Sequence, residues 1–208
     1  MRIVAITKPK NEPEHCLIHE MQRLRARVFC GRLAWNVPCT SGLEVDSFDE
    51  LNPTYILCLD CSDAVIGCAR LLPATNGTML EKVFPQLLEN AHLRTHARMI
   101  ESSRFCVDTK AAGKQQQAGL HTATLAMFAG IVEWSILNGY SEVVTATDVR
   151  LERILRRAGW PLKRLGSPVQ INETRSIAGV LPANWESFDR LRPGIYSSNL
   201  PISKKEVV

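Results

Sequence analysis

The chain lacks a long hydrophobic run. In its 208 residues, no stretch approaches the roughly 18 consecutive apolar residues that a membrane span needs. The apolar run at the N-terminus is also too short for a secretory signal. We therefore expect a protein of the cytoplasm with no membrane partner. Because 45% of the residues are hydrophobic, we expect a packed core, and wholesale disorder is excluded.

The chain also has little net charge and no metal-binding cysteine pattern. A formal net charge of +4 does not by itself indicate a nucleic-acid-binding protein. Cys58 and Cys61 have the C-x-x-C spacing, but no second ligand pair accompanies them, so we expect no metal site. The seven cysteines are an odd number, which argues against a disulfide framework. We expect buried, reduced thiols.

Internal repeats and low-complexity segments are absent as well, and the length fits one domain. We expect that domain over residues 1–196 and a loose tail over 197–208. The element order predicts an α/β fold with a mixed, mostly antiparallel sheet sandwiched by helices, not a doubly wound Rossmann fold. The expected elements are a strand at 2–6, a helix at 12–32, a functional loop at 33–53, hairpin strands at 55–59 and 64–72, a strand at 99–107, a helix at 115–138, a strand at 142–146 and a helix at 149–158.

Two N-terminal segments have the composition of a binding site for a small charged ligand. Arg25 lies among apolar positions of the expected helix, where a fixed guanidinium could bind a carboxylate with two hydrogen bonds. The following loop carries Asp46 and Asp49. Together with Phe29 and Trp35, these carboxylates would suit a cationic ligand, because aromatic faces attract cations. The alternatives are a surface arginine and a solvated loop.

The expected strand at 99–107 carries charges between apolar residues. Two-residue alternation puts Glu101 and Ser103 on one face, with Arg104 on the other unless a bulge intervenes. Such a strand could be catalytic. The alternative is an edge strand with exposed charges.

Two later segments could bind anions. Residues 116–121 form an incomplete version of the turn with which acyl-CoA N-acyltransferases bind pyrophosphate at a helix N-terminus. Further on, one acid, Glu152, accompanies six bases: Arg150, Arg153, Arg156, Arg157, Lys163 and Arg164. This run is either a solvated helix face or a docking patch for an acidic partner. We expect no nucleic-acid partner, because no binding motif or aromatic interleaving supports one.

Ten spaced positions together resemble the acyl-homoserine-lactone synthases, the autoinducer synthases of bacterial quorum sensing. The resemblance covers about residues 20–182, and the blocks 101–108 and 144–148 are similar to the rhizobial and agrobacterial branch. Every one of the ten carries the residue typical of the family: Arg25, Phe29, Trp35, Asp46, Asp49, Arg70, Phe84, Glu101, Ser103 and Arg104.

The resemblance implies a fold similar to that of the N-acetyltransferase superfamily. It also implies two substrates, S-adenosylmethionine and an acyl thioester on acyl carrier protein, with acyl coenzyme A as the other donor to consider. The products would be an N-acyl-homoserine lactone, methylthioadenosine and the free carrier thiol. No cofactor is implied, because S-adenosylmethionine is consumed as a substrate.

The resemblance further implies roles for individual residues. The catalytic residues would be Glu101, Ser103 and Arg104, with Glu101 as the base. Backbone N–H groups around Ser103 would donate to the oxyanion. Arg104 would orient the substrate carboxylate. The hydroxyl of Thr145 would donate a hydrogen bond to the oxygen of a 3-oxo group on the acyl chain. S-adenosylmethionine would contact Arg25, Phe29, Trp35, Asp46, Asp49, Arg70, Phe84 and Arg104; the acyl chain Leu125, Phe128, Val144, Thr145 and Thr147; and the carrier Arg150, Arg153, Arg156 and Arg157.

Two other interpretations remain at this stage. An acyl-CoA-dependent N-acyltransferase acting on another small amine would share the fold but would not form methylthioadenosine. A non-catalytic binding module that uses the basic helix would tolerate replacement of Glu101 and Arg104.

Overall fold

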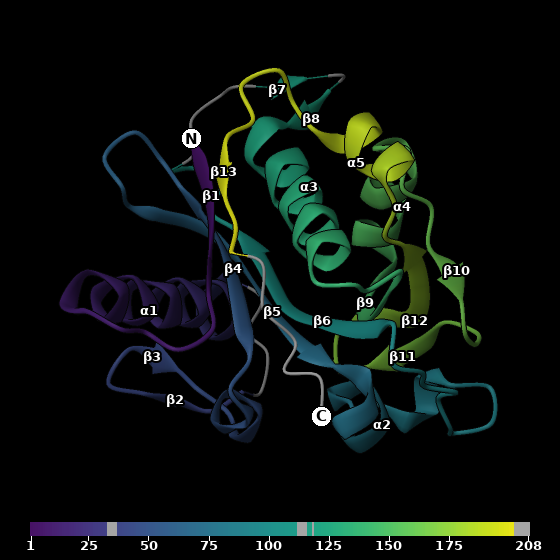
Figure 1. Cartoon of the computed structure of the whole chain (residues 1–208). Helices are drawn as coiled ribbons and strands as arrows, with labels where there is room; N and C mark the ends of the chain where they lie inside the picture. Colours follow the sequence, from purple (N-terminus) through teal and green to yellow (C-terminus); the bar gives the residue numbers. More distant parts are fainter. Residues whose placement is uncertain (33–36, 112–115, 118, 202–208) are drawn as a thin grey trace.

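The structure, a computed structural model, describes residues 1–32, 37–111, 116–117 and 119–201. A large sheet runs through the middle of the molecule, with helices on both faces (Figure 1). The helices are α1 (Glu12–Arg25), α2 (Met79–Val83), α3 (Thr122–Leu137), α4 (Val149–Arg157) and α5 (Trp185–Leu191), with a π-helix η1 (Ala26–Arg32) and 3-10 turns η2 (Ser47–Leu51), η3 (Ala74–Asn76) and η4 (Pro85–Leu87). Within this described part, no helix is long and apolar enough to cross a membrane.

The main sheet is mixed and mostly antiparallel. Its strand order is β10-β12-β9-β6-β5-β4-β1-β13, and β11 pairs with β12. The parallel pairs are β6 with β9 and β1 with β13. The strands of this sheet are β1 (Arg2–Ile6), β4 (Thr54–Leu59), β5 (Val65–Pro73), β6 (Met99–Val107), β9 (Glu142–Asp148), β10 (Lys163–Arg164), β11 (Val169–Ile171), β12 (Thr174–Pro182) and β13 (Ser198–Asn199). The expected fold class is therefore confirmed.

Strand alternation sorts the core into two layers. In β4, Ile56 and Cys58 pack toward α3, whereas Leu57 and Leu59 pack toward α1. Side chains of successive strand residues point to opposite faces, so an almost wholly apolar strand is what a sheet covered on both faces requires. Figure 1 shows α1 on one side of the sheet and α3 on the other.

Strands β6 and β9 pair only over their first three residues. Met99, Ile100 and Glu101 lie opposite 142–144, and beyond that point the two strands separate. The parallel neighbours thus enclose a wedge, which residues 102–107 of β6 and 145–148 of β9 border. Backbone groups that face this gap lack a partner strand, which makes the wedge a natural place for an extended ligand.

A bulge in β6 sets the direction of Arg104. Cys68 of β5 lies opposite Cys106, and Arg70 lies opposite Ser103, so one residue of β5 faces two of β6. Arg104 occupies the left-handed region, with φ at 53°. An extra residue in one strand reverses the alternation after it. Arg104 therefore lies on the same face as Glu101 and Ser103, the exception for which the sequence analysis allowed.

Three expected segments have different bounds. The helix expected at 12–32 is α1 followed by the π-helical η1. The helix expected from 115 begins at Thr122, because β7 (Gln116–Gln117) and β8 (Leu120–His121) pair as a small hairpin and the His121 side chain caps α3. The expectation of a loose tail over 197–208 is wrong for Ser198 and Asn199, because these two residues form β13, which pairs with β1. Residues 202–208 lie outside the described residues.

The expectation of seven buried, reduced thiols is wrong for four cysteines. Cys30 and Cys39 form a disulfide, because η1 and the short hairpin of β2 (Cys39–Thr40) and β3 (Leu43–Glu44) come together in space. Cys16 and Cys61 are exposed. Cys58, Cys68 and Cys106 are the thiols that are buried as expected.

Candidate active site

Three arginines and three carboxylates from several elements form one buried cluster, which we call the ion cluster. Arg25 comes from α1, Arg70 from β5 and Arg104 from β6. The acids are Glu44 at the end of β3, Asp46 and Asp49 of the η2 turn. With three charges of each sign the cluster is neutral, which is how a folded protein tolerates buried ions.

Asp49 is the most heavily bonded acid of the cluster. It accepts hydrogen bonds from Arg25 Nη1 at 2.8 Å and Nη2 at 2.9 Å, and from Arg70 Nη1 at 2.9 Å. The hydroxyl of Tyr55 donates to it at 2.7 Å. Burial would raise the pKa of Asp49, but the bonds and charges of Arg25 and Arg70 outweigh this effect and hold the pKa below its usual range.

Asp46 links the cluster to the local fold. It caps η2 by accepting from the Phe48 N–H at 2.9 Å, while its own N–H donates to Asp49 at 2.9 Å. Its carboxylate also pairs with Arg70 and, at 2.6 Å, with Arg104. The solvated loop, which was the alternative interpretation of these acids, is not what the structure shows: Asp46 and Asp49 form an ordered capping box and point inward.

Glu44 was not singled out by the sequence analysis, yet it is fully buried and bridges two arginines. Arg25 Nε donates to one of its oxygens and Arg104 Nε to the other, the latter at 3.0 Å. Met79 is a second residue not foreseen. Its sulfur lies 3.5 Å from both Arg70 Nη2 and Arg104 Nη1. The only sequence signal for Glu44 is its place among the acids of the loop, which does not distinguish it from exposed neighbours.

Aromatic rings cover two of the guanidinium groups. Arg104 lies 5.7 Å from the centre of the Phe29 ring, and Arg70 lies 5.4 Å from that of Phe48. Phe84 is partly buried against the small apolar cluster that contains Phe48. These contacts bring Phe29 and Phe84 to the site. Trp35 lies outside the described residues.

Glu101 is buried in β6 beside the cluster, with a side chain that reaches α2. Both of its oxygens accept backbone N–H bonds at 2.7 Å, one from Met79 and one from Leu80. Burial raises the pKa of Glu101, and these two bonds only partly oppose the effect. Two positions away, the Ser103 hydroxyl accepts from Arg70 Nε at 3.1 Å.

A cavity of about 680 Å³ extends from the ion cluster into the wedge between β6 and β9. It is large enough for a drug-sized ligand. The expected site residues on its wall are Phe29, Asp46, Phe84, Glu101, Ser103, Arg104, Thr145, Thr147 and Arg150. Arg25, Asp49 and Arg70 lie behind this wall in the ion cluster.

Three residues expected to contact the acyl chain do not line this cavity. Leu125 and Phe128 are buried in the core on the α3 side, where Phe128 stacks on Phe105 at 5.1 Å. Val144 packs in a core cluster with Leu80 and Ala178. The wall of the cavity is instead formed near them by Thr124, Ala146, Leu151 and Ile154.

The four arginines of α4 are exposed but do not share one direction. Arg150 lines the large cavity, and Arg153 and Arg156 line a smaller one. Arg157 packs over the β7–β8 hairpin, where a Cβ on Gly119 would lie 2.2 Å from its Nη2. Residues 116–121, expected as a pyrophosphate-binding turn, form that hairpin in part.

Sequence comparison now places these features in a family. The profile of the autoinducer synthase family matches residues 10–191. The chain belongs to the autoinducer synthase family. This synthase is 54% identical over 200 residues to the probable acyl-homoserine-lactone synthase of Sinorhizobium fredii, with 96% of each chain covered. It is 51% identical over 198 residues to the acyl-homoserine-lactone synthase of Agrobacterium fabrum, covering 95% of this chain and 94% of the relative.

Solved structures share the fold. TofI, in a ternary complex with an inhibitor and MTA, has a TM-score of 0.77 at 28% identity and covers 92% of this synthase and 96% of its own chain. The CoA-dependent acyl-homoserine lactone synthase BjaI, with SAM and isopentyl-CoA, has a TM-score of 0.81 at 24% identity, with coverage of 96% and 93%. FeeM, an N-acyl amino acid synthase, shares the fold with a TM-score of 0.57 at 11% identity, with coverage of 91% and 99%.

The comparisons confirm the function expected from the resemblance. The synthase is an acyltransferase that makes an N-acyl-homoserine lactone, and its fold is similar to that of N-acyltransferases. The two other interpretations, an acyl-CoA-dependent N-acyltransferase acting on another small amine and a non-catalytic module, are not supported by the relatives at 51–54% identity.

Proposed function

We propose that this synthase acylates the amine of S-adenosylmethionine from an acyl-carrier-protein thioester, after which lactonisation releases methylthioadenosine. The observation that carries the proposal is the continuity of the large cavity. One end lies against Asp46, Phe29 and Arg104 of the ion cluster, and the other lies in the wedge between β6 and β9. A charged methionine derivative suits the first end, and an extended acyl thioester suits the second.

The positions of the arginines divide their roles. Arg104 lines the cavity, so it is the group placed to orient the carboxylate of S-adenosylmethionine. Arg25 and Arg70 are completely buried and act through Asp49 and Asp46, which they hold in place. We therefore assign Arg104 and Asp46 to substrate contact and Arg25 and Arg70 to positioning. Phe29 and Phe84 would face the sulfonium and the adenosine.

Acyl transfer needs a base and a site for the oxyanion. Glu101 faces the cavity, and its carboxylate would take the proton of the amine, directly or through a water. The bulge at Arg104 interrupts the β5–β6 ladder, so backbone N–H groups there would donate to the oxyanion of the tetrahedral intermediate. The substrate's own carboxylate then attacks its γ-carbon and expels methylthioadenosine, a step that depends on orientation.

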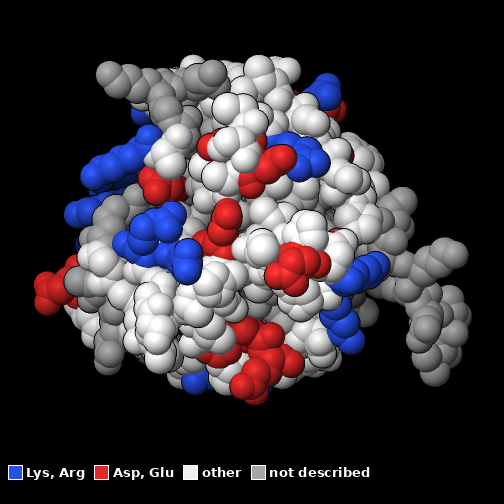
Figure 2. All heavy atoms as spheres, turned by 90° about the vertical axis from the view of Figure 1, so that its left-hand side faces the viewer, with Lys and Arg blue, Asp and Glu red and all other residues white. Residues whose placement is uncertain are grey.

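The choice of donor rests on charge. An acyl carrier protein is acidic, and α4 presents Arg150 at the rim of the large cavity with Arg153 and Arg156 beside it. Figure 2 shows the α1 side of the molecule, where acidic and basic side chains are interspersed. The α1 side therefore offers an acidic partner no uniformly basic surface. The proposal places the reaction in the cytoplasm, where both substrates are made.

The test is a direct product analysis. Purified synthase is incubated with S-adenosylmethionine and matched acyl chains on acyl carrier protein or coenzyme A, and the products are identified by mass spectrometry. We expect lactone and methylthioadenosine in equal amounts, with the higher kcat/KM for the carrier-bound donor. Acylated product without methylthioadenosine, or a clear preference for coenzyme A, would contradict the proposal.

A further inference from the structure

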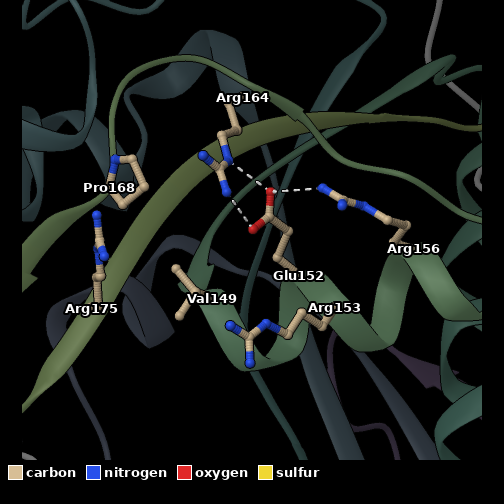
Figure 3. Close-up of a pocket in the computed structure, with 7 residues that line it drawn as sticks. All are labelled: Val149, Glu152, Arg153, Arg156, Arg164, Pro168 and Arg175. Carbon is tan, nitrogen blue, oxygen red and sulfur yellow. Dashed lines mark hydrogen bonds and ion pairs between the residues drawn. The ribbon is translucent and has the colours of Figure 1, made fainter.

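The large cavity has different chemistry at its two ends. At the wedge end, α4 carries the basic surface assigned above to the donor, where Glu152 lies between Arg164 and Arg156 (Figure 3). At the other end, a disulfide between Cys30 and Cys39 joins η1 to β2. The acyl transfer described above makes no use of this bond, so its role needs a separate explanation.

The disulfide ties together two pieces of the cavity wall. The residues that directly precede each cysteine line the large cavity: Val28 and Phe29 before Cys30, and Val37 and Pro38 before Cys39. The centre of the Phe29 ring lies 5.7 Å from the guanidinium carbon of Arg104, and Val37 packs against the apolar cluster that contains Phe29. This part of the wall is the end proposed to receive S-adenosylmethionine.

The same bond anchors the hairpin that carries Glu44. β2 and β3 form a two-stranded sheet of their own, in which Cys39 lies opposite Glu44. A two-stranded hairpin by itself is only marginally stable in water. Glu44 holds β3 through its bonds to Arg25 and Arg104, and the disulfide holds β2. Loss of the disulfide would therefore weaken the attachment of β2 and of the wall residues beside it.

The bond is within reach of thiols in solution, because Cys39 is exposed and Cys30 is half-buried. Exposed disulfides are the labile ones. The proposed function places the synthase in the cytoplasm, where the disulfides that do form are usually transient and either catalytic or redox-sensing. A bond between these two cysteines is therefore expected to form and break with the supply of thiol and disulfide.

We propose that Cys30 and Cys39 are a redox-sensitive pair, and that their disulfide tightens the S-adenosylmethionine end of the large cavity. This inference rests on the proposed function. In the oxidation, the two thiols exchange with a small disulfide such as oxidised glutathione. The S–S bond of glutathione breaks, a bond forms between the two cysteine sulfurs, and the two glutathione thiols take up the two protons. Reduction by two glutathione thiols is the reverse.

The expected effect on binding follows from preorganisation. A disulfide restricts the segments on both sides of it, so wall residues such as Phe29 and Val37 lose less conformational entropy when the substrate binds. After reduction, S-adenosylmethionine must order these segments itself, and its Kd should rise. The wedge end is built from β6, β9 and α4, so the affinity for the acyl donor should change little.

The test compares S-adenosylmethionine binding by the oxidised and the reduced synthase. The protein is treated with oxidised glutathione or with a phosphine reductant, the reagent is removed without exposure to air, and the Kd is measured by titration calorimetry in the absence of acyl donor. We expect a Kd about tenfold lower for the oxidised form and the same ratio in the KM for S-adenosylmethionine, with kcat and the KM for the donor unchanged. Peptide mass spectrometry verifies the state of the pair.

Two double variants identify the cysteines responsible. Cys30→Ser/Cys39→Ser should have the Kd of the reduced wild type after either treatment. Cys16→Ser/Cys61→Ser, which removes the two exposed free thiols, is the matched control and should keep the tenfold response. Thermal unfolding of each protein in both states checks that a raised Kd does not come from partial unfolding.

The outcomes separate this inference from the proposed function. Equal Kd values in the two states would overturn the inference, as would a response that persists in Cys30→Ser/Cys39→Ser. A linkage that never forms, or one that no excess of reduced glutathione breaks, would also overturn it. These results leave the proposed function standing. If neither form binds S-adenosylmethionine, both the inference and the proposed function are wrong.

Discussion

Arg25 and Asp49 are joined side by side through two hydrogen bonds, at 2.8 and 2.9 Å, in the interior of the protein. Asp49→Asn should therefore be severe, because it leaves Arg25 and Arg70 short of one negative charge. We expect the free energy of unfolding to fall by about 3–5 kcal/mol and activity to be lost with it. Chemical denaturation measures the first effect and lactone formation the second.

The Arg2–Asp63 pair provides the control for this experiment. It has the same separation of 2.8 Å, but its side chains are 46% and 71% exposed. Asp63→Asn should change stability by less than about 1 kcal/mol. Equal effects of the two substitutions would mean that the ion cluster is not the buried network described above.

The pH dependence should report Glu101 rather than Asp49. Burial raises the pKa of Glu101, so an ionised base forms only as the pH rises above the ordinary glutamate value of about 4.5. The acid limb of kcat/KM should have its midpoint above that value. The pKa of Asp49 is shifted in the opposite direction, below its ordinary value. Its contribution to stability is present above its unfolded pKa of about 3.9 and is lost only as the pH falls through its depressed folded pKa.

Glu101→Gln should lower kcat by roughly 10²–10⁴. Met79 and Leu80 both donate to the carboxylate, and an amide offers only one oxygen, so the variant should also lose about 1–3 kcal/mol of stability. The pH profile distinguishes the two roles, because loss of the base removes the acid limb from the residual activity. If a folded Glu101→Gln variant keeps the acid limb of the pH profile, Glu101 only anchors α2 and is not the base.

Thr145→Val tests the choice of acyl chain. Thr145 lines the large cavity, and its hydroxyl has only a 3.3 Å contact to the Ala146 carbonyl, so it can donate to a 3-oxo group. We expect the preference for 3-oxo over unsubstituted donors to fall by about 1–2 kcal/mol, measured as a ratio of kcat/KM values. The same change at Thr147, also on the wall, shows whether one hydroxyl is responsible. An unchanged ratio in both variants would place selectivity elsewhere.

Thiol labelling should separate the cysteines into three classes. Cys16 and Cys61 are exposed and should react with a maleimide in the folded protein. Burial raises the pKa of Cys58 to about 12, and Cys68 and Cys106 are also buried, so these three should react only after unfolding. Cys30 and Cys39 should require a reductant first. Rapid labelling of all seven without reductant would exclude this pairing. Peptide mass spectrometry provides the measurement.

Much of the fold is predictable because strong local patterns agree with the tertiary structure. The hairpin strands around Asp60–Asp63, the capped start of α2 at Thr78 and the end of α3 before Gly139 all follow from turn and capping chemistry. The start of α3 was misplaced, because residues from 116 onward are compatible with either a helix or the small hairpin. Helix and strand boundaries depend on such competing local choices.

The site itself was only partly predictable from the residues. Charged residues in apolar surroundings pointed to Arg25, Glu101 and Arg104, but Glu44 has no such signal. It is one of several acids in its loop, and only the tertiary fold buries it between two arginines. Leu125 and Phe128 show the converse limit. Their apolar character predicts burial, but whether they border a cavity depends on where β6 and β9 separate.

That separation has a mechanical consequence. In the described residues, the strand ladder between the five-strand half of the sheet and the half built on β9 and β12 consists of three residue pairs, from Met99 to Glu101 along β6. A donor arm lying in the gap, as proposed, bridges the two halves much as an added strand would. The gap beyond those three pairs is then closed only while the donor is bound, so part of the enzyme's cohesion would be supplied by a molecule that it consumes in every turnover.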